Sequence, residues 1–397
     1  MSAAGISPWV SRTLLACGFL FVFTETLLSP FWPQFFQRVF GVEALEVSGH
    51  YIALCRLTVL IGAPLWGLLA RRFEPMWLLI IGQGGAALFT LLCAFVDSLD
   101  EFVVLSVLLL LCKSSYLLFY SVLIELSGQR GQAQVVGRVQ ATVHLALISS
   151  TAASAWLLQL DNPLRLFMLA AALDVLQIVL CAFVLKRRGP RQAATPSAER
   201  RRVWTWRAVG AFAAAVLLLN LAGNVVRPYF TLFSQQQLHL EAWPAAVAFF
   251  LPSVMVLLCM PWVPTLCQSG LRRVGFSVSV ALMALALLAQ ALADSYAALL
   301  AARALFGATL LLAQANLELH LFEGAGDDVH WQYSLASVVQ NLAQLLAPLL
   351  AAALVAGYSL ASPFIAAAAL LLLTLVIAHY GVFAAPRRPL PVGEPTP

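Results

Sequence analysis

Apolar residues in this chain come in runs of about 20, separated by short segments rich in charged and turn-forming residues. Each run is long enough for one α-helix to cross a hydrocarbon core of about 30 Å. The pattern predicts about twelve membrane-crossing helices. Their expected ranges are 13–37, 50–70, 76–96, 102–126, 138–160, 163–185, 208–233, 244–267, 275–293, 296–321, 333–357 and 359–383.

The composition agrees with this pattern. Hydrophobic residues make up 61% of the 397 residues and charged residues 10%, against about 45–50% and about 25% in a soluble domain. A soluble chain this apolar would have no way to cover its surface with polar groups. We therefore expect an all-α membrane protein, because helices satisfy their own backbone hydrogen bonds in lipid. We expect the first run to stay in the protein as a membrane helix and not to be a cleaved signal peptide.

Basic residues gather in alternate loops between the predicted spans, while the opposite loops carry mostly acidic residues. The basic set is Arg71, Arg72, Arg130, Arg138, Arg272, Arg273, Arg387, Arg388 and the run from Lys186 to Arg207. By the positive-inside rule, these loops and both termini lie in the cytoplasm. Acidic Glu323, Asp327 and Asp328 fall on the same side, but acidic residues contribute little to topology. The net charge of +5 thus reflects membrane orientation and does not indicate nucleic-acid binding.

A basic segment without apolar periodicity divides the spans six and six. The expected organisation is an N-terminal six-helix bundle over 1–185, a cytoplasmic linker over 186–207, a C-terminal six-helix bundle over 208–384 and a disordered tail over 385–397. The seven cysteines fall in or at the ends of spans, so we expect no disulfides. Arginine far outnumbers lysine and Ala and Leu dominate, which is typical of a GC-rich bacterial genome and favours a bacterial inner membrane.

The two halves look like repeats of each other. Pro30-Phe31 and Pro228-Tyr229 are 198 residues apart, in the first and seventh spans. Pro64 and Pro261 are 197 residues apart, and so are Asp97-Ser98 and Asp294-Ser295. Three pairs at nearly one offset predict two six-helix pseudo-repeats, the arrangement in which transporters place a substrate site between the halves.

Between the second and third spans the sequence reads Gly67-Leu68-Leu69-Ala70-Arg71-Arg72-Phe73-Glu74-Pro75. This resembles the G-x-L-A-D-R-x-G-x-R-R loop of the major facilitator superfamily, with Arg71 in place of the acidic residue. The equivalent loop of the second half, Gly270-Leu271-Arg272-Arg273, fits the end of that signature. The resemblance implies a twelve-span secondary transporter similar to drug or metabolite:proton antiporters. It also implies gating roles for loop and inner-end residues, which we expect to be Gly67, Arg72, Glu125, Glu318, Gly270 and Arg273.

Arg303 and Gly307 in span ten resemble the R-x-x-x-G pattern that many proton-coupled members carry in span four. The repeat offset places Ser106 opposite Arg303, but the span-four cation is Lys113, about two turns further along. The span-five glycine-proline signature of antiporters is missing. Export is therefore weakly supported, and uptake by proton symport is the alternative.

Polar and aromatic residues recur at helical spacing on the helices that line the pore in this family. Such stripes favour a central aqueous cavity, although amides and hydroxyls also join membrane helices to each other. The expected substrate-binding residues are Trp32, Lys113, Tyr116, Tyr120, Asn220, Asn224, Arg227, Arg303, Gln314, Gln340, Asn341 and Gln344. If Lys113, Arg227 and Arg303 share one cavity, they need an anion. Alternatively, Glu25, Glu318 and Asp174 neutralise them, which would leave room for a neutral or cationic molecule.

Three charged or titratable residues inside spans are candidates for proton coupling. Glu25 and Arg56 lie on consecutive antiparallel spans at similar depth and are expected to be near each other. Their pair is either structural or the place where Glu25 binds and releases a proton. His144 in span five is the third candidate, because imidazole titrates near neutral pH. Asp174 lies in span six, which is peripheral in this family, and the sequence gives it no role beyond that of a neutralising acid.

The sequence favours a proton-coupled transporter for a small organic anion or zwitterion, with export of a siderophore-like metabolite or a drug as the first expectation. No metal-binding or nucleophile motif argues for an enzyme, and no phosphate loop argues for a primary pump. The expected partners are the substrate, protons and the lipid bilayer, with no cofactor and no nucleic acid. We expect a monomer.

Overall fold

The computed structural model describes residues 8–70, 72–116, 137–156, 162–187, 206–322 and 329–383. Within these ranges the secondary structure is helical, joined by short turns. The first half contains α1 (Pro8–Thr26), α2 (Trp32–Phe40), α3 (Leu45–Leu69), α4 (Pro75–Leu92), α5 (Leu99–Lys113), an unlabelled helix over 137–156, and α7 (Arg165–Arg187). The second half contains α8 (Trp206–Val225), α9 (Phe230–Leu238), α10 (Ala242–Cys259), α11 (Val263–Leu266), α12 (Arg272–Ala291), α13 (Tyr296–Phe322), α14 (Val329–Gly357) and α15 (Ser362–Ile377).

Ten helical stretches of the described chain are long and apolar enough to cross a membrane. The expected spans at 102–126 and 138–160 are not among them. These two spans coincide with α5 and with the helix over 137–156, and both continue into residues outside the described ranges. The all-α membrane architecture is confirmed, and the count of twelve spans stays a prediction.

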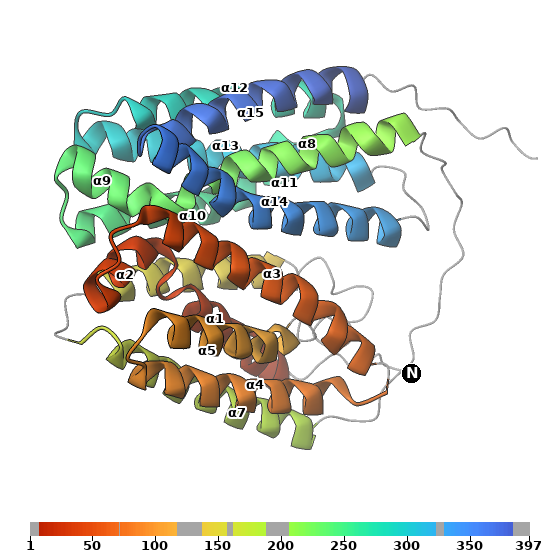
Figure 1. Ribbon diagram of the computed structural model, residues 1–397. Coiled ribbons are helices and arrows are strands. Elements are labelled where there is room, and N and C mark those ends of the chain that lie inside the picture. Colours follow the sequence, from red (N-terminus) through yellow and green to blue (C-terminus); the bar gives the residue numbers. More distant parts are fainter. Residues whose placement is uncertain are drawn as a thin grey trace, which may run out of the picture.

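The helices gather in two bundles, one from each half of the sequence (Figure 1). The last helix of the first bundle, α7, ends toward the right of the view, the side on which α8 begins. We call this the linker end, because residues 188–205 connect the bundles there. The opposite end, with the turns at 41–44 and 239–241, is the loop end. Across the two bundles, α3 lies against α14.

The first and seventh crossings break at equivalent positions. A 3₁₀ turn, η1 (Ser29–Phe31), separates α1 from α2, and another, η4 (Arg227–Tyr229), separates α8 from α9. Each turn contains the proline of the repeat, Pro30 or Pro228, which cannot donate the backbone hydrogen bond that a continuous helix needs. The proline pair noted in the sequence thus produces the same break in both halves.

The repeated Asp-Ser dipeptides also have the same structural role in the two halves. The Ser98 hydroxyl accepts a hydrogen bond from the Glu101 amide at 3.3 Å and caps α5. In the second half, the Ser295 hydroxyl accepts one from the Ala298 amide at 3.3 Å at the start of α13. Serine is a favoured cap because its oxygen satisfies an amide that has no partner within the helix.

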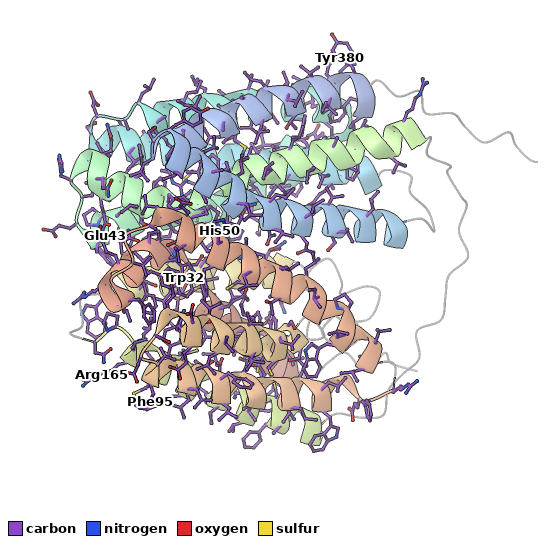
Figure 2. All side chains as sticks on the ribbon, in the orientation of Figure 1. Trp32, Glu43, His50, Phe95, Arg165 and Tyr380 are labelled. Atoms are coloured by element: carbon purple, nitrogen blue, oxygen red, sulfur yellow. The ribbon has the colours of Figure 1, made fainter. Side chains whose placement is uncertain are left out.

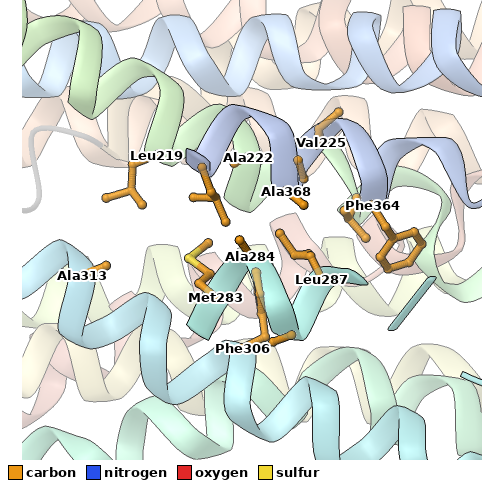
Figure 3. Packing of buried hydrophobic residues seen from close by; sticks show 14 of the residues in the cluster. Leu219, Ala222, Val225, Met283, Ala284, Leu287, Phe306, Ala313, Phe364 and Ala368 are labelled. Carbon is orange, nitrogen blue, oxygen red and sulfur yellow. The ribbon is translucent and has the colours of Figure 1, made fainter. Parts of the chain in front are cut away.

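Small and aromatic residues pack the interior of each bundle. In the C-terminal bundle, Figure 3 shows side chains from α8, α12, α13 and α15 meeting, including Leu219, Met283, Phe306 and Phe364. In the N-terminal bundle, the core at the loop end is aromatic, with Phe102 at its centre. Large apolar side chains also cover the outside. Phe95 and Tyr380, labelled in Figure 2, are exposed, as expected of a surface that meets lipid instead of water.

The R-x-x-x-G residues of α13 hold α13 against α10 at a proline. Pro252 lies inside α10 and has no amide proton, so the carbonyl of Ala248 loses its helical donor. The buried Arg303 side chain replaces that donor: its Nε lies 2.9 Å from the Ala248 oxygen, and its Nη2 lies 2.9 Å from the Phe249 oxygen. One turn further along α13, Gly307 packs directly on Pro252.

Other groups complete the surroundings of Arg303. Its guanidinium lies 4.1 Å from the centre of the Phe230 ring, a cation–π contact. Its Nη1 lies 3.4 Å from Oε1 of Gln290 on α12. The charge is therefore balanced by carbonyl dipoles and an aromatic face within the C-terminal bundle.

We predict that Gly307→Ala destabilises the protein by about 1–3 kcal/mol, because overpacking forces a well-packed contact apart. A Cβ at this position would lie 2.5 Å from the Pro252 Cα, which cannot move without shifting α10. The measurement is the thermal unfolding midpoint of the detergent-purified protein. Gly223→Ala is the matched control, because a Cβ there meets its nearest neighbour at 3.6 Å. Equal midpoints for the two variants would contradict the close α10–α13 packing.

Candidate functional site

The two bundles join at the loop end through uncharged hydrogen bonds. The Gln34 amide donates to Oγ1 of Thr231 at 3.1 Å and to Oε1 of Gln235 at 2.9 Å. The Thr231 hydroxyl in turn donates to the Pro30 carbonyl. Gln34 and Thr231 are 197 residues apart, the offset of the repeat, so equivalent positions of the halves meet here.

Two further contacts close the bundles together at this end. The Tyr229 hydroxyl donates to the Leu45 carbonyl at 2.7 Å. Gly49 of α3 packs so tightly on α14 that a Cβ would lie 2.5 Å from the Ala352 Cβ. These contacts bring the halves within direct packing distance at the loop end.

Glu25 and Arg56 form the ion pair expected from the sequence. Arg56 Nη1 lies 3.8 Å from Glu25 Oε1, which is beyond hydrogen-bond distance. The Glu25 side chain is 25% exposed and the Arg56 side chain is 38% exposed, so water reaches both. The ion pair is therefore loose, and either Glu25 or Arg56 can pair with another charged group instead.

Lys113 and Asp174 form a second ion pair that is tighter and buried. Lys113 Nζ lies 3.3 Å from Asp174 Oδ1, and the two side chains are 4% and 0% exposed. Lys113 also donates to Oγ1 of Thr24 at 2.6 Å. The hydroxyls of Thr24 and Thr90 each donate to an Asp174 oxygen at 3.2 Å. Four helices, α1, α4, α5 and α7, therefore meet at one carboxylate.

A cavity of about 100 Å³ lies inside the N-terminal bundle beside both pairs. All of the residues that line it fall between positions 24 and 170. Glu25, Arg56 and Lys113 supply its charged wall, and Trp32 and Tyr51 supply part of its aromatic wall. Figure 2 shows Trp32 within this bundle, toward the loop end. A cavity with charged groups beside aromatic rings suits a small molecule with one ionic group.

Arg227 is an exposed cation of the opposite bundle. Its Nη1 lies 3.3 Å from Oδ1 of Asn224, one turn back in the sequence, and its guanidinium lies 5.9 Å from the Phe249 ring centre. The turn η4, which begins at Arg227, packs against η1, α2 and α3 of the N-terminal half. Arg227 thus belongs to the turn where the two bundles meet.

The cations expected to share one cavity are held at different places. Lys113 is neutralised by Asp174, as in the alternative considered from the sequence, while Arg303 is bound to the carbonyls of α10. Arg303 is not among the residues that line the cavity in the N-terminal bundle. Of the three, Arg227 is the one that stays exposed.

The remaining residues predicted to bind substrate are dispersed. Tyr116 stacks on Phe21, with ring centres 3.5 Å apart. Asn220 and Asn341 each donate to a carbonyl of their own helix four residues earlier, at 2.9 Å. Gln340 donates to Oε1 of Glu318 at 3.4 Å and joins α14 to α13. Gln314 and Gln344 are half-buried, and Tyr120 lies outside the described residues.

The predicted gating residues lie near the linker end, apart from Glu125, which is outside the described residues. Gly67 and Gly270 have open space where a Cβ would stand, and Arg72 is exposed. Arg273 Nη2 lies 2.7 Å from a ring nitrogen of His379, at the end of the last helix. Their gating role stays a prediction.

Sequence reasoning considered Asp174 only as one of three acids that could neutralise the cations and did not pair it with Lys113, although it is the most enclosed carboxylate among the residues described above. Its partners Thr24 and Thr90 were missed as well. The available signal was the presence of one buried cation and one buried acid in the same six-helix half, since an unpaired charge is rarely tolerated there.

Comparison with known proteins supports this architecture. No curated protein matches the sequence. Three solved structures share the fold at low identity. The POT family transporter PepTSo has a TM-score of 0.75 at 13% identity, covering 94% of this chain and 98% of that one. The nucleoside transporter NupG has a TM-score of 0.71 at 11% identity, covering 92% and 98%.

The third structure is the human organic anion transporter MFSD10 (TETRAN), with a TM-score of 0.66 at 14% identity, covering 93% of this chain and 98% of that one. At these identities the likeness establishes the fold alone. The family model named Major Facilitator Superfamily matches residues 14–317, most of the sequence. The chain therefore belongs to the Major Facilitator Superfamily and is a membrane transporter, not an enzyme.

Proposed function

We propose that this transporter is a proton-coupled carrier of a small organic anion or zwitterion. The observation that carries the proposal is the loose Glu25–Arg56 pair on the wall of the cavity. When Glu25 takes up a proton, Arg56 loses its counter-charge on the wall of the cavity. An anionic substrate then becomes the most favourable partner for Arg56. Proton binding and anion binding support each other at this pair.

The charge of Arg227 adds to this preference for anions. It belongs to the turn η4, which packs against α3 of the N-terminal half, and it has an uncharged partner, Asn224. Two guanidiniums from opposite bundles suit a carboxylate, phosphate or sulfonate, which accept hydrogen bonds from arginine in pairs. The aromatic residues beside the cavity, such as Trp32, suit an apolar body. The fold likeness to an organic anion transporter agrees with this substrate class but does not establish it.

The mode of coupling, symport or antiport, follows from the same argument. An antiporter requires the proton and the substrate to compete for one site, as a cation would compete at Glu25. An anion that binds Arg56 after Glu25 is protonated instead travels with the proton. We therefore favour symport coupling, and export of a secreted metabolite remains compatible with it when the metabolite is abundant inside. Drug:proton antiport is the second candidate, because the sequence resembles such antiporters.

The topology completes the proposal. We place the linker end in the cytoplasm of a bacterial inner membrane, because the basic loops lie there. The loop-end contacts between the bundles then close the external side, and substrate would reach the site from the cytoplasm. The partners are protons, the substrate and the bilayer, and we propose a monomer that needs no cofactor.

Glu25→Gln is expected to abolish proton movement coupled to substrate, because the amide cannot carry a proton between the two sides. The measurement is the internal pH of proteoliposomes loaded with a pH-sensitive dye, screened against anionic, zwitterionic and cationic metabolites. Glu43→Gln is the matched control, since Glu43 is exposed at the loop end (Figure 2). Proton movement unchanged in Glu25→Gln would remove Glu25 as the proton carrier.

Arg227→Gln is expected to weaken transport of anions about tenfold or more, the cost of one hydrogen bond to a charged group. A neutral analogue of the same shape should be affected much less. The measurement is the concentration dependence of initial uptake rates for each compound. Arg165→Gln, an exposed cation at the loop end, serves as the control. Equal losses for the anion and the neutral analogue would refute charge recognition by Arg227.

A further inference from the structure

Glu25 lies on the last turn of α1, where the hydrogen bonds of the helix itself cease to support the backbone. α1 ends at Thr26, and the turn η1, which contains Pro30, follows. The last carbonyls of a helix have no amide partner within it, and a proline supplies no amide proton. The direction of the Glu25 side chain therefore depends on the groups that hold this turn from outside.

Thr24, the residue before Glu25, is held by the buried ion pair of Lys113 and Asp174. Its hydroxyl accepts a hydrogen bond from Lys113 Nζ at 2.6 Å and donates to Asp174 Oδ1 at 3.2 Å. Both charged side chains are buried, so little water competes for these bonds. Hydrogen bonds to charged groups are also stronger than uncharged ones. The first attachment of this turn is therefore a strong one, to α5 and α7.

Thr26, the residue after Glu25, is attached to another helix. Its hydroxyl and that of Ser150, on the helix over 137–156, lie 2.8 Å apart and share a hydrogen bond. Ser150 is fully buried. The Thr26 hydroxyl also donates to the Val22 carbonyl of its own helix at 2.6 Å. One side chain thus links the end of α1 both to the preceding turn and to a neighbouring helix.

Helix geometry places Glu25 between these two attachments. Successive residues of an α-helix are about 100° apart around the axis, since 3.6 residues make one turn. The side chains of Thr24 and Thr26 therefore point about 200° apart, and that of Glu25 points into the sector between them. Arg56 of α3 lies in this direction, with its Nη1 3.8 Å from Glu25 Oε1. Rotation of the turn would break a threonine contact and move Glu25 away from Arg56.

We propose that Thr24 and Thr26 are positioning residues for proton coupling, because they hold Glu25 beside Arg56. The proposal rests on the carrier function above and deepens it. It also gives the buried ion pair a part in that function, as the fixed point to which Thr24 is attached. While Glu25 stays in place, Arg56 accepts a substrate anion only after Glu25 is protonated. When the turn is loosened, Arg56 becomes available without a proton, and substrate crosses uncoupled.

The first test is chemical labelling of the full-length protein in detergent, which needs no substrate. Dicyclohexylcarbodiimide reacts with carboxyl groups that carry a proton, so the ion pair with Arg56 protects Glu25. Thr24→Val removes a hydroxyl and keeps the side-chain shape. It should raise the rate of Glu25 labelling, measured by peptide mass spectrometry, about tenfold or more, the effect of one hydrogen bond to a charged group. Thr26→Val should raise this rate about two- to tenfold, because the bond to Ser150 is uncharged.

Conservative variants separate positioning from folding. Thr24→Ser and Thr26→Ser keep the hydroxyls and should return Glu25 labelling to the rate of the unaltered protein. Thr374→Val is the matched control, because the Thr374 hydroxyl donates to a carbonyl of its own helix, at 2.8 Å, in the C-terminal bundle. Labelling of the buried Asp174 should stay unchanged in all variants, since a loss of folding would expose both carboxyl groups to the reagent.

The second test measures the protons moved per substrate molecule in proteoliposomes. The probe is benzenesulfonate, because a sulfonate stays ionised and carries no proton of its own. In Thr24→Val and Thr26→Val, the number of protons moved per benzenesulfonate should fall below that of the unaltered protein. A variant that merely folds less well would lose both movements together and keep their ratio.

Three results would overturn the proposal: an unaltered rate of Glu25 labelling in both valine variants, labelling raised equally by valine and serine, or an unchanged proton ratio in the valine variants of a coupled carrier. Absence of coupled proton movement in the unaltered protein would instead count against the carrier function. The labelling rates would then still decide whether the two threonines position Glu25.

Discussion

Charge inside a membrane protein is stable only where another group compensates it, and this constraint explains most of the polar architecture described here. Lys113 is buried against Asp174, and Arg303 is held by the carbonyls of α10 beside Pro252. Glu25 and Arg56 face each other across a looser, wetter gap. The tightness of each arrangement separates charges that support the fold from charges that are free to change partners.

The same constraint connects the fold to transport. A proline break in the first crossing and its counterpart in the seventh turn these helices where the halves meet. The contacts between Gln34 and Thr231 join the halves at one end, and the loose ion pair lies within the N-terminal bundle. Because Glu25 is the counter-charge of Arg56, an anion replaces it beside Arg56 most easily once Glu25 is protonated. Proton binding and anion binding are then coupled because Arg56 changes its ionic partner from Glu25 to the substrate.

Much of this could be predicted from the sequence. The apolar runs predicted the helices. The repeated Asp-Ser dipeptides indicated equivalent positions, and Ser98 and Ser295 both cap helices in the structure. Glu25 and Arg56 were expected to pair because they lie on consecutive helices at similar depth. The pairing of Asp174 with Lys113 was not predicted, because this contact depends on how four helices pack. Residue spacing does not contain that information.

The position of Arg303 was hidden for a related reason. The pattern with Gly307 pointed to a pore, whereas the side chain turns to a carbonyl freed by Pro252 on another helix. Sequence shows that a charge must be compensated, but the partner is chosen by the packing.

The most direct test of the account is the charge moved in each transport cycle. Proteoliposomes adsorbed on a solid-supported membrane report net current while a carboxylate that the protein transports is applied. If anion and proton travel together, substrate will accumulate and the internal pH will fall without a net current. A current in step with substrate uptake would show that the charges are not balanced, and it would contradict the joint movement of one anion and one proton on which the account depends.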